Sequence, residues 1–261
     1  MRTARQALAV MTVLASLLAG AGPATAERLI ASLTNHRVMI TSNYTGVELV
    51  LFGSVERDGA GPAHSGPYDI VATVTGPRES LRTRRKERVL GIWVNTQSRT
   101  FINPPSYLAV LASNSLDAIT STENQRRLQL GIANIPLPEL VNNDIGEVTN
   151  DPFRAALVML MREHGLYSEE PDDVAFLTPT LFRAAIVLPA QVPTGNYNVD
   201  VKLFAGGNLI AHTDSAFEIA KVGFEQFVVT AARDHGLAYG LATAMMALLT
   251  GWIASVAFRR D

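Results

Sequence analysis

Four basic side chains stand close together in the stretch RRKERVLGIWVN, residues 84–95, which runs into an apolar segment containing Trp93. Guanidinium and ammonium groups bind oxyanions and carboxylates, so this run is a candidate site for an anion or a protein partner. The alternative is a solvated strand end that pairs with nearby acids. We expect the strand to become more deeply buried toward Trp93. The candidate binding residues are Arg84, Arg85, Lys86 and Arg88.

The sequence contains no pattern typical of a catalytic or metal site. Its five histidines do not form a His-Glu-x-x-His motif, and it has no cysteine to complete a zinc site. His64 precedes Ser65, but neighbours in sequence do not form a nucleophile and base pair, and no Gly-x-Ser-x-Gly elbow is present. A P-loop and a Gly-x-Gly-x-x-Gly motif are absent too. We therefore expect no enzyme activity, no cofactor and no bound metal.

Two acidic stretches are better explained as solvated loops than as sites. Residues 142–151, NNDIGEVTND, lack the ligand spacing of a calcium-binding EF-hand loop. Residues 168–173, SEEPDD, suit a linker, and a general acid and base role for Glu169 or Asp172 would rest on composition alone.

The two ends of the chain predict its topology. Residues 1–26 carry Arg2 and Arg5, then an apolar run too short to span a bilayer, then Ala24-Thr25-Ala26, which together are typical of a secretory signal peptide cut after Ala26. Residues 236–258 are uncharged and long enough to cross a bilayer as a helix. Arg259 and Arg260 follow, so residues 259–261 should form a cytoplasmic tail. We expect a single-pass protein of the bacterial inner membrane, with most of the chain in the periplasm.

Small residues recur along the predicted membrane helix at steps of three and four. This spacing puts them on one helical face, where a second helix could approach closely. The alternative is chance, because membrane helices are often rich in alanine. If the face is functional, the helix associates with a membrane protein or with itself, in addition to contacting lipid. The candidate residues are Gly236, Gly240, Ala244, Ala247, Gly251 and Ser255.

The charge of the exported part argues against some partners. The whole chain has 22 basic and 24 acidic residues, and leaving out the four arginines and one aspartate of the terminal segments gives an acidic excess of about five. Such a balance favours neither nucleic acid nor an anionic membrane surface as a partner.

The periodicity of the exported part predicts a mainly β fold. Residues 27–113 contain one strand pattern after another, which indicates a first immunoglobulin-like β-sandwich domain. Residues 114–170 form a helical insert or linker, with an amphipathic helix that starts at the N-cap Asp151 and Pro152 and ends at Gly165. Residues 171–222 return to strands and predict a second, small sandwich in which Tyr197 resembles a tyrosine corner. Residues 223–235 are a juxtamembrane linker.

The chain resembles the alphaproteobacterial putative transmembrane protein family over nearly its whole mature length. The matching stretches occur in the same order and are GVELVLFGS, RRKERVLGIWVN, EHGLYSEEP, VPTGNYNV, KVGFEQFV and YGLATAMMALLTGWIASVAFRR. The resemblance implies an exported protein with one C-terminal span, and its members are often encoded beside permeases of the sulfite-exporter type. It carries over no catalytic residue.

Together these features predict a non-enzymatic accessory or interaction subunit of a polytopic membrane protein, with a transporter of the sulfite-exporter type as one candidate partner. The alternative is an anchored module that binds an anionic solute or an envelope polymer through residues 84–88.

Overall fold

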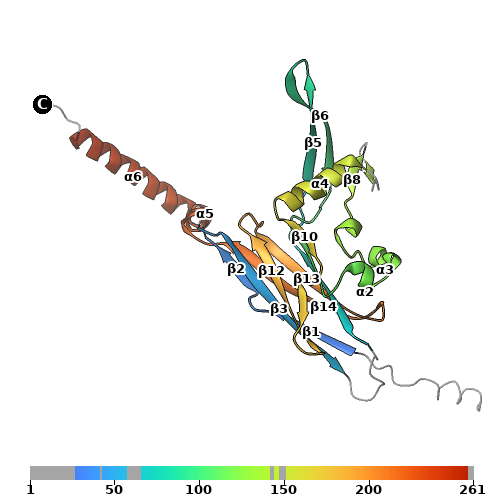
Figure 1. The fold of residues 1–261 in the computed structure, drawn as a ribbon. Coiled ribbons are helices and arrows are strands. Elements are labelled where there is room, and N and C mark those ends of the chain that lie inside the picture. Colours follow the sequence, from blue (N-terminus) through green and yellow to red (C-terminus); the bar gives the residue numbers. More distant parts are fainter. Residues whose placement is uncertain (1–26, 42, 58–65, 142–143, 147–150, 258–261) are drawn as a thin grey trace, which may run out of the picture.

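The computed structural model describes residues 27–41, 43–57, 66–141, 144–146 and 151–257 (Figure 1). Two β-sheets pack face to face to form a sandwich. The smaller sheet has the strand order β1 (Glu27–Leu33), β3 (Gly46–Arg57), β12 (Leu181–Pro189) and β11 (Val174–Phe176). The larger sheet has the order β10 (Tyr167–Glu170), β7 (Leu108–Ala112), β4 (Tyr68–Thr75), β13 (Gly195–Ala205), β14 (Asn208–Lys221) and β2 (Arg37–Ile40). The predicted mainly β fold is confirmed.

The hydrophobic core lies between these two sheets and follows from alternation along the strands. In β13 the side chains of Tyr197, Val199, Val201 and Leu203 are all buried in this core. The intervening residues face the other side of the sheet, because successive side chains of a strand point to opposite faces. A run with a period of two therefore predicts both the strand and its buried face.

The prediction of two separate sandwich domains is not confirmed. Strand β3, from the first predicted domain, pairs with β12, from the second, over nine residue pairs. Strand β4 pairs with β13 in the same way. Each sheet thus combines strands from residues 27–113 and 171–222, and one core serves both segments. The physical reason is that a sheet with one face in the core needs a second layer over that face, and here both layers take strands from both segments.

The helical insert covers the outer face of the larger sheet and builds a second core there. It comprises α2 (Leu116–Ile119), α3 (Thr122–Arg127), the 3₁₀ helix η1 (Ile132–Asn134) and α4 (Pro152–Glu163). Phe153, Leu157 and Met161 of α4 are buried in this second core, together with Phe204 of β13. The insert explains why Phe204 interrupts the polar face of its strand.

Two local predictions are confirmed, the start of α4 and the hydrogen bond of a tyrosine corner. Helix α4 begins after Asp151, whose carboxylate accepts a hydrogen bond from the Phe153 N–H at 2.8 Å, with Pro152 at the first helical position. The Tyr197 hydroxyl donates to the Pro193 carbonyl four residues upstream at 2.6 Å, which is the hydrogen bond of a tyrosine corner. Gly206 and Gly207 have positive φ angles in the β13–β14 turn.

A third sheet, outside the sandwich, contains β5 (Leu81–Val89), β6 (Ile92–Phe101), β8 (Glu139–Val141) and β9 (Asp144–Gly146). The stretch 88–95 was expected to be one strand. It is instead the end of a hairpin, because β5 ends at Val89 and β6 begins at Ile92. The β5–β6 hairpin projects beyond α4 and away from the sandwich (Figure 1).

The C-terminal part is helical. Helix α5 (Phe224–Asp234) lies where we expected a juxtamembrane linker, and α6 (Gly236–Ala257) extends away from the sandwich (Figure 1). Helix α6 is the one helix in the described part of the chain that is long and apolar enough to cross a membrane. The predicted signal peptide at 1–26, residues 58–65, the larger part of the acidic stretch 142–151 and the predicted tail 259–261 lie outside the described residues.

Candidate functional site

The tip of the β5–β6 hairpin is apolar and exposed. Val89, Leu90, Ile92 and Trp93 expose 44, 99, 65 and 69% of their surfaces. The expectation that the strand becomes buried toward Trp93 is therefore wrong. The reason is that the chain reverses at Leu90 and Gly91, so the apolar run forms the end of a projecting ribbon and never reaches either core.

The turn at the tip is an unusual place for a leucine. Val89 pairs with Ile92, and the two residues between them, Leu90 and Gly91, have φ angles of 51° and 90°. A two-residue turn with positive φ at both positions favours Asn-Gly, since a branched side chain is strained there. Leu90 is thus strained and almost fully exposed. Neither property stabilises the fold, which makes the tip a candidate contact surface.

The four basic residues predicted as a site lie together on the hairpin, between the tip and α4. All four are exposed. Arg85 forms an ion pair with Glu87 at 3.2 Å, and Arg88 donates to the Gly91 carbonyl at 3.4 Å. Within the described residues, Arg84 and Lys86 make no ion pair. Two positive charges of this cluster are therefore free to bind an external anion.

The basic residues do not enclose a ligand. A hollow of about 250 Å³ beside them is lined by Arg82, Arg84 and residues 95–98 of β6. Arg82 is already engaged there, because it donates to the Ser98 hydroxyl at 2.8 Å. Small-molecule sites are concave and bury most of their ligand, whereas this surface belongs to a projecting ribbon. Binding of a small anionic solute at residues 84–88 stays a prediction.

The base of the hairpin is fixed by an ionic cluster that the sequence analysis missed. Phe101 of β6 pairs with Glu139 of β8, and both residues are fully buried. Arg99 of β6 lies 3.4 Å from a carboxylate oxygen of Asp151, at the start of α4, and its guanidinium lies 5.4 Å from the centre of the Phe153 ring. These contacts join the hairpin to the helical insert. The single hint in the sequence is that Glu139 stands in the otherwise apolar run IPLPELV.

Glu139 is placed so that its carboxyl favours the protonated form. Neither of its oxygens meets a donor among the described groups, and the Asp151 carboxyl faces it. Two carboxyls can hydrogen-bond to each other only by sharing a proton. Burial raises the pKa of Glu139, and Asp151 raises it further, whereas Arg99 and Arg154 act in the opposite direction.

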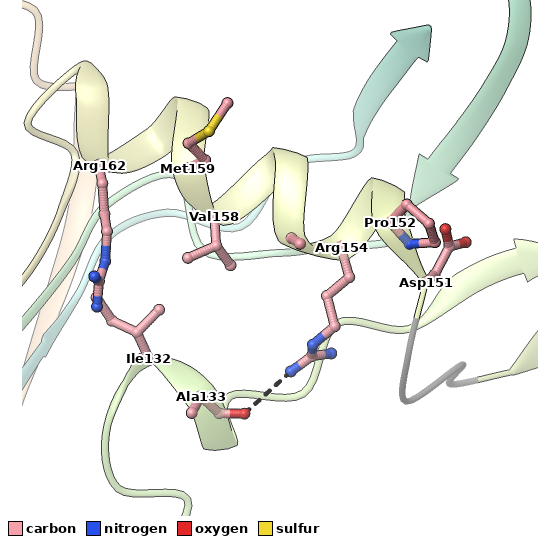
Figure 2. Close-up of a pocket in the computed structure, with 9 residues that line it drawn as sticks. Ile132, Ala133, Asp151, Pro152, Arg154, Val158, Met159 and Arg162 are labelled. Carbon is pink, nitrogen blue, oxygen red and sulfur yellow. Dashed lines mark hydrogen bonds between the residues drawn. The ribbon is translucent and has the colours of Figure 1, made fainter.

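A groove of about 670 Å³ runs between α4 and η1 (Figure 2). Arg154 and Arg162 extend from α4 toward Ile132 and Ala133 (Figure 2). Arg154 is already occupied, because it donates to the Ala133 carbonyl at 3.4 Å and to the Ile135 carbonyl at 2.8 Å. The groove therefore offers one further cation, Arg162, next to apolar side chains.

The other residues considered as catalytic or metal-binding are dispersed. The described part of the chain holds no group of three or more His, Cys, Asp and Glu side chains that could bind a metal ion. His212 lies in β14, whereas His36, His164 and His235 lie in three separate connections between elements. Glu169 accepts a hydrogen bond from the Ile132 N–H at 2.6 Å and so holds η1 in place. A role for Glu169 as a general acid or base gains no support from this geometry. His64 and Ser65 lie outside the described residues.

The small residues of the membrane helix all lie on α6, and their steps of three and four place them within one face of about 100°. A methyl group added at Gly236, Gly240 or Gly251 would meet no atom within 4 Å. Nothing else among the described residues covers this face. The structure brings the six predicted residues onto one side of a helix, but it does not identify what they contact.

Comparison with known proteins gives one family. A search of curated proteins finds no match to this chain. A family described as "Putative transmembrane protein (Alph_Pro_TM)" matches residues 28–260, which include the sandwich, the hairpin and α6. The family description agrees with a membrane location through α6. Since the match covers most of its length, the chain belongs to this transmembrane protein family.

Proposed function

We propose that this protein is a non-enzymatic accessory subunit of a polytopic membrane protein. In this proposal α6 anchors the chain in the bacterial inner membrane, the sandwich lies in the periplasm and the tail lies in the cytoplasm. A transporter of the sulfite-exporter type is the candidate partner. The observation that carries the proposal is α6 itself, a 22-residue apolar helix whose small-residue face is uncovered.

A helix that acts only as a tether needs apolar side chains all round, because lipid tails contact every face. A continuous face of small residues serves a different purpose, since it lets a second helix approach the backbone and gain van der Waals contacts. Bulkier side chains, including Leu237, Leu241 and Met245, lie off this face and suit contact with lipid.

The test compares two pairs of identical substitutions on opposite sides of α6. Ala244→Leu with Ala247→Leu adds bulk to the small-residue face, whereas Ala238→Leu with Ala242→Leu adds the same bulk about half a turn away. Both variants keep the helix apolar, so both should insert. The measurement is the amount of polytopic partner that co-purifies with each variant from native membranes in mild detergent.

We expect the first variant to recover about tenfold less partner, because overpacking a helix contact costs roughly 1–3 kcal/mol. The control variant should recover as much partner as the unaltered protein. Equal recovery with both variants would show that the small-residue face does not bind the partner. Loss with both would show that the helix is sensitive to bulk in general, which also contradicts the proposal.

A further inference from the structure

We propose that the tip of the β5–β6 hairpin inserts into the surface of the bilayer that anchors α6, with its basic residues contacting anionic lipid headgroups. The protein would then contact the membrane at two places. This inference is independent of the partner of α6, because it concerns lipid alone.

The distribution of polar and apolar groups along the hairpin matches the layers of a bilayer surface. The tip residues Val89, Leu90, Ile92 and Trp93 are apolar and exposed, and the basic residues follow directly behind them. From Arg88 to Leu90 the strand advances about 7 Å, which is similar to the roughly 5–10 Å depth of interfacial apolar side chains. Tryptophan is enriched at this depth, and basic side chains favour the headgroup layer above it.

Charge complementarity favours lipid as the occupant. Between Leu81 and Phe101 the hairpin carries six basic residues and one acidic residue, Glu87. The net acidity of the exported part argued against an anionic membrane partner, but that average conceals this local excess. Arg84 and Lys86 are unpaired within the described residues, so they are available to phosphate groups. A narrow, convex tip also suits a fluid surface, whereas a protein partner would have to provide a matching groove.

The position of the hairpin relative to α6 favours contact between the hairpin tip and the membrane. If α6 crosses the membrane, the parts of the chain on the same side as the start of α6 stay near the bilayer surface. Both α6 and the hairpin project from the upper side of the molecule in Figure 1, while β1 lies at the opposite end of the sandwich. The strain at Leu90 is consistent with this role, since a residue strained in the fold is expected where an external contact uses it.

The chain has two tryptophans, which makes the test specific. Trp252 lies in α6 and off the small-residue face, so Trp252→Phe leaves Trp93 as the sole tryptophan. The full chain with this substitution is placed singly in lipid nanodiscs, with or without an anionic phospholipid. Emission from Trp93 is measured with lipids brominated at a shallow or a deep position of the acyl chain, and separately with the neutral aqueous quencher acrylamide.

Two variants distinguish the contribution of the apolar tip from the contribution of the basic residues. Leu90→Asn with Ile92→Thr removes apolar surface from the tip and gives the turn its favoured Asn-Gly sequence, so the hairpin should stay folded. Arg84→Ser with Lys86→Ser removes the two unpaired charges. The matched control is Arg126→Ser with Arg127→Ser, which removes two exposed charges from α3, apart from the hairpin tip (Figure 1).

We expect shallow bromolipids to quench Trp93 more than deep ones, and the nanodisc to shield Trp93 from acrylamide. The tip variant should lose both effects. Each basic residue removed should lower the ratio of inserted to free hairpin about fivefold in anionic nanodiscs, and the α3 control should leave it unchanged. The proposal would be overturned if bromolipids left the emission of Trp93 unchanged and acrylamide quenched Trp93 as strongly as it quenches free tryptophan amide. So would shielding that appears only when native membrane proteins are added.

Discussion

The single sandwich can be tested at Gly53, where β3 passes beneath the ring of Phe182. The two residues are cross-strand partners, and Phe182 is fully buried. A methyl group at Gly53 would overlap this ring, with Phe182 Cε1 at 2.5 Å and the Ile30 carbonyl oxygen at 2.8 Å. The ring has no exposed side toward which it could move, and pairing with β3 holds the Ile30 carbonyl in place. Gly53→Ala should therefore destabilise the sandwich.

The expected cost follows from this crowding. Overpacking of a core costs about 1–3 kcal/mol, and the upper end applies here because a backbone atom is involved. A loss of about 3 kcal/mol would lower the Tm by roughly 6–12 °C for a domain of this size. Thermal unfolding of the full chain in detergent, followed by the circular dichroism of the strands, measures this shift. Gly66→Ala is the control, because a methyl group there meets no atom within 4 Å.

A double-mutant cycle makes the test specific for the pairing of the two segments. Phe182→Leu leaves space above Gly53, so the added methyl should cost less in this background than in the unaltered protein. We expect a coupling free energy of about 1–2 kcal/mol, which is in the range of residues in contact. If Gly53 and Phe182 belonged to two independent sandwiches, their effects would add within about 0.5 kcal/mol. Additive effects would therefore refute the topology described here.

Glu139→Gln tests the base of the hairpin, and the comparison of Tyr197→Phe with Tyr44→Phe tests the tyrosine corner. The pKa of Glu139 is raised in the folded protein, so its contribution to stability is present below the ordinary value of 4.5 and is lost as the pH rises through the raised value. Glu139→Gln should thus gain in stability relative to the unaltered protein as the pH rises from about 4.5 through the raised pKa of Glu139. Urea unfolding at a series of pH values measures this gain, and a difference that does not change with pH would contradict the shared proton. Tyr197→Phe removes the 2.6 Å hydrogen bond to Pro193 and should cost about 1 kcal/mol. Tyr44→Phe, whose hydroxyl lies 3.3 Å from the Leu188 carbonyl, should cost less, and the reverse order would contradict the tyrosine corner.

The parts of the fold predicted from the sequence are those set by local signals. The alternation in β13 predicts a strand and its buried face, and Asp151 with Pro152 predicts the start of α4. The pairing of β3 with β12 has no such signal, because about 130 residues separate them and alternation does not say which strand lies alongside. The same limit hides Glu139, whose burial depends on strand and helix partners far from it in the chain.

The basic run was expected at the exposed start of a strand that becomes buried toward Trp93, and this burial is the part of the prediction that is wrong. Residues 84–88 do form an exposed basic cluster. The apolar run after them was expected in the core, because hydrophobicity alone does not distinguish a residue that packs inside from one that contacts an external partner. Leu90-Gly91 also lacks the Asn-Gly sequence by which such turns are recognised. The reversal at Leu90, which keeps the apolar run out of both cores, is visible only in the structure.

The central claim, that this protein is an accessory subunit of a polytopic membrane protein, is tested most directly by purifying the unaltered chain from native membranes. A tag after Asp261 leaves α6 and the hairpin intact, and mass spectrometry identifies and counts the accompanying proteins. We expect one polytopic membrane protein to accompany the tagged chain in a fixed ratio. Recovery of the chain alone, or only with copies of itself, under conditions that preserve other membrane complexes would contradict it.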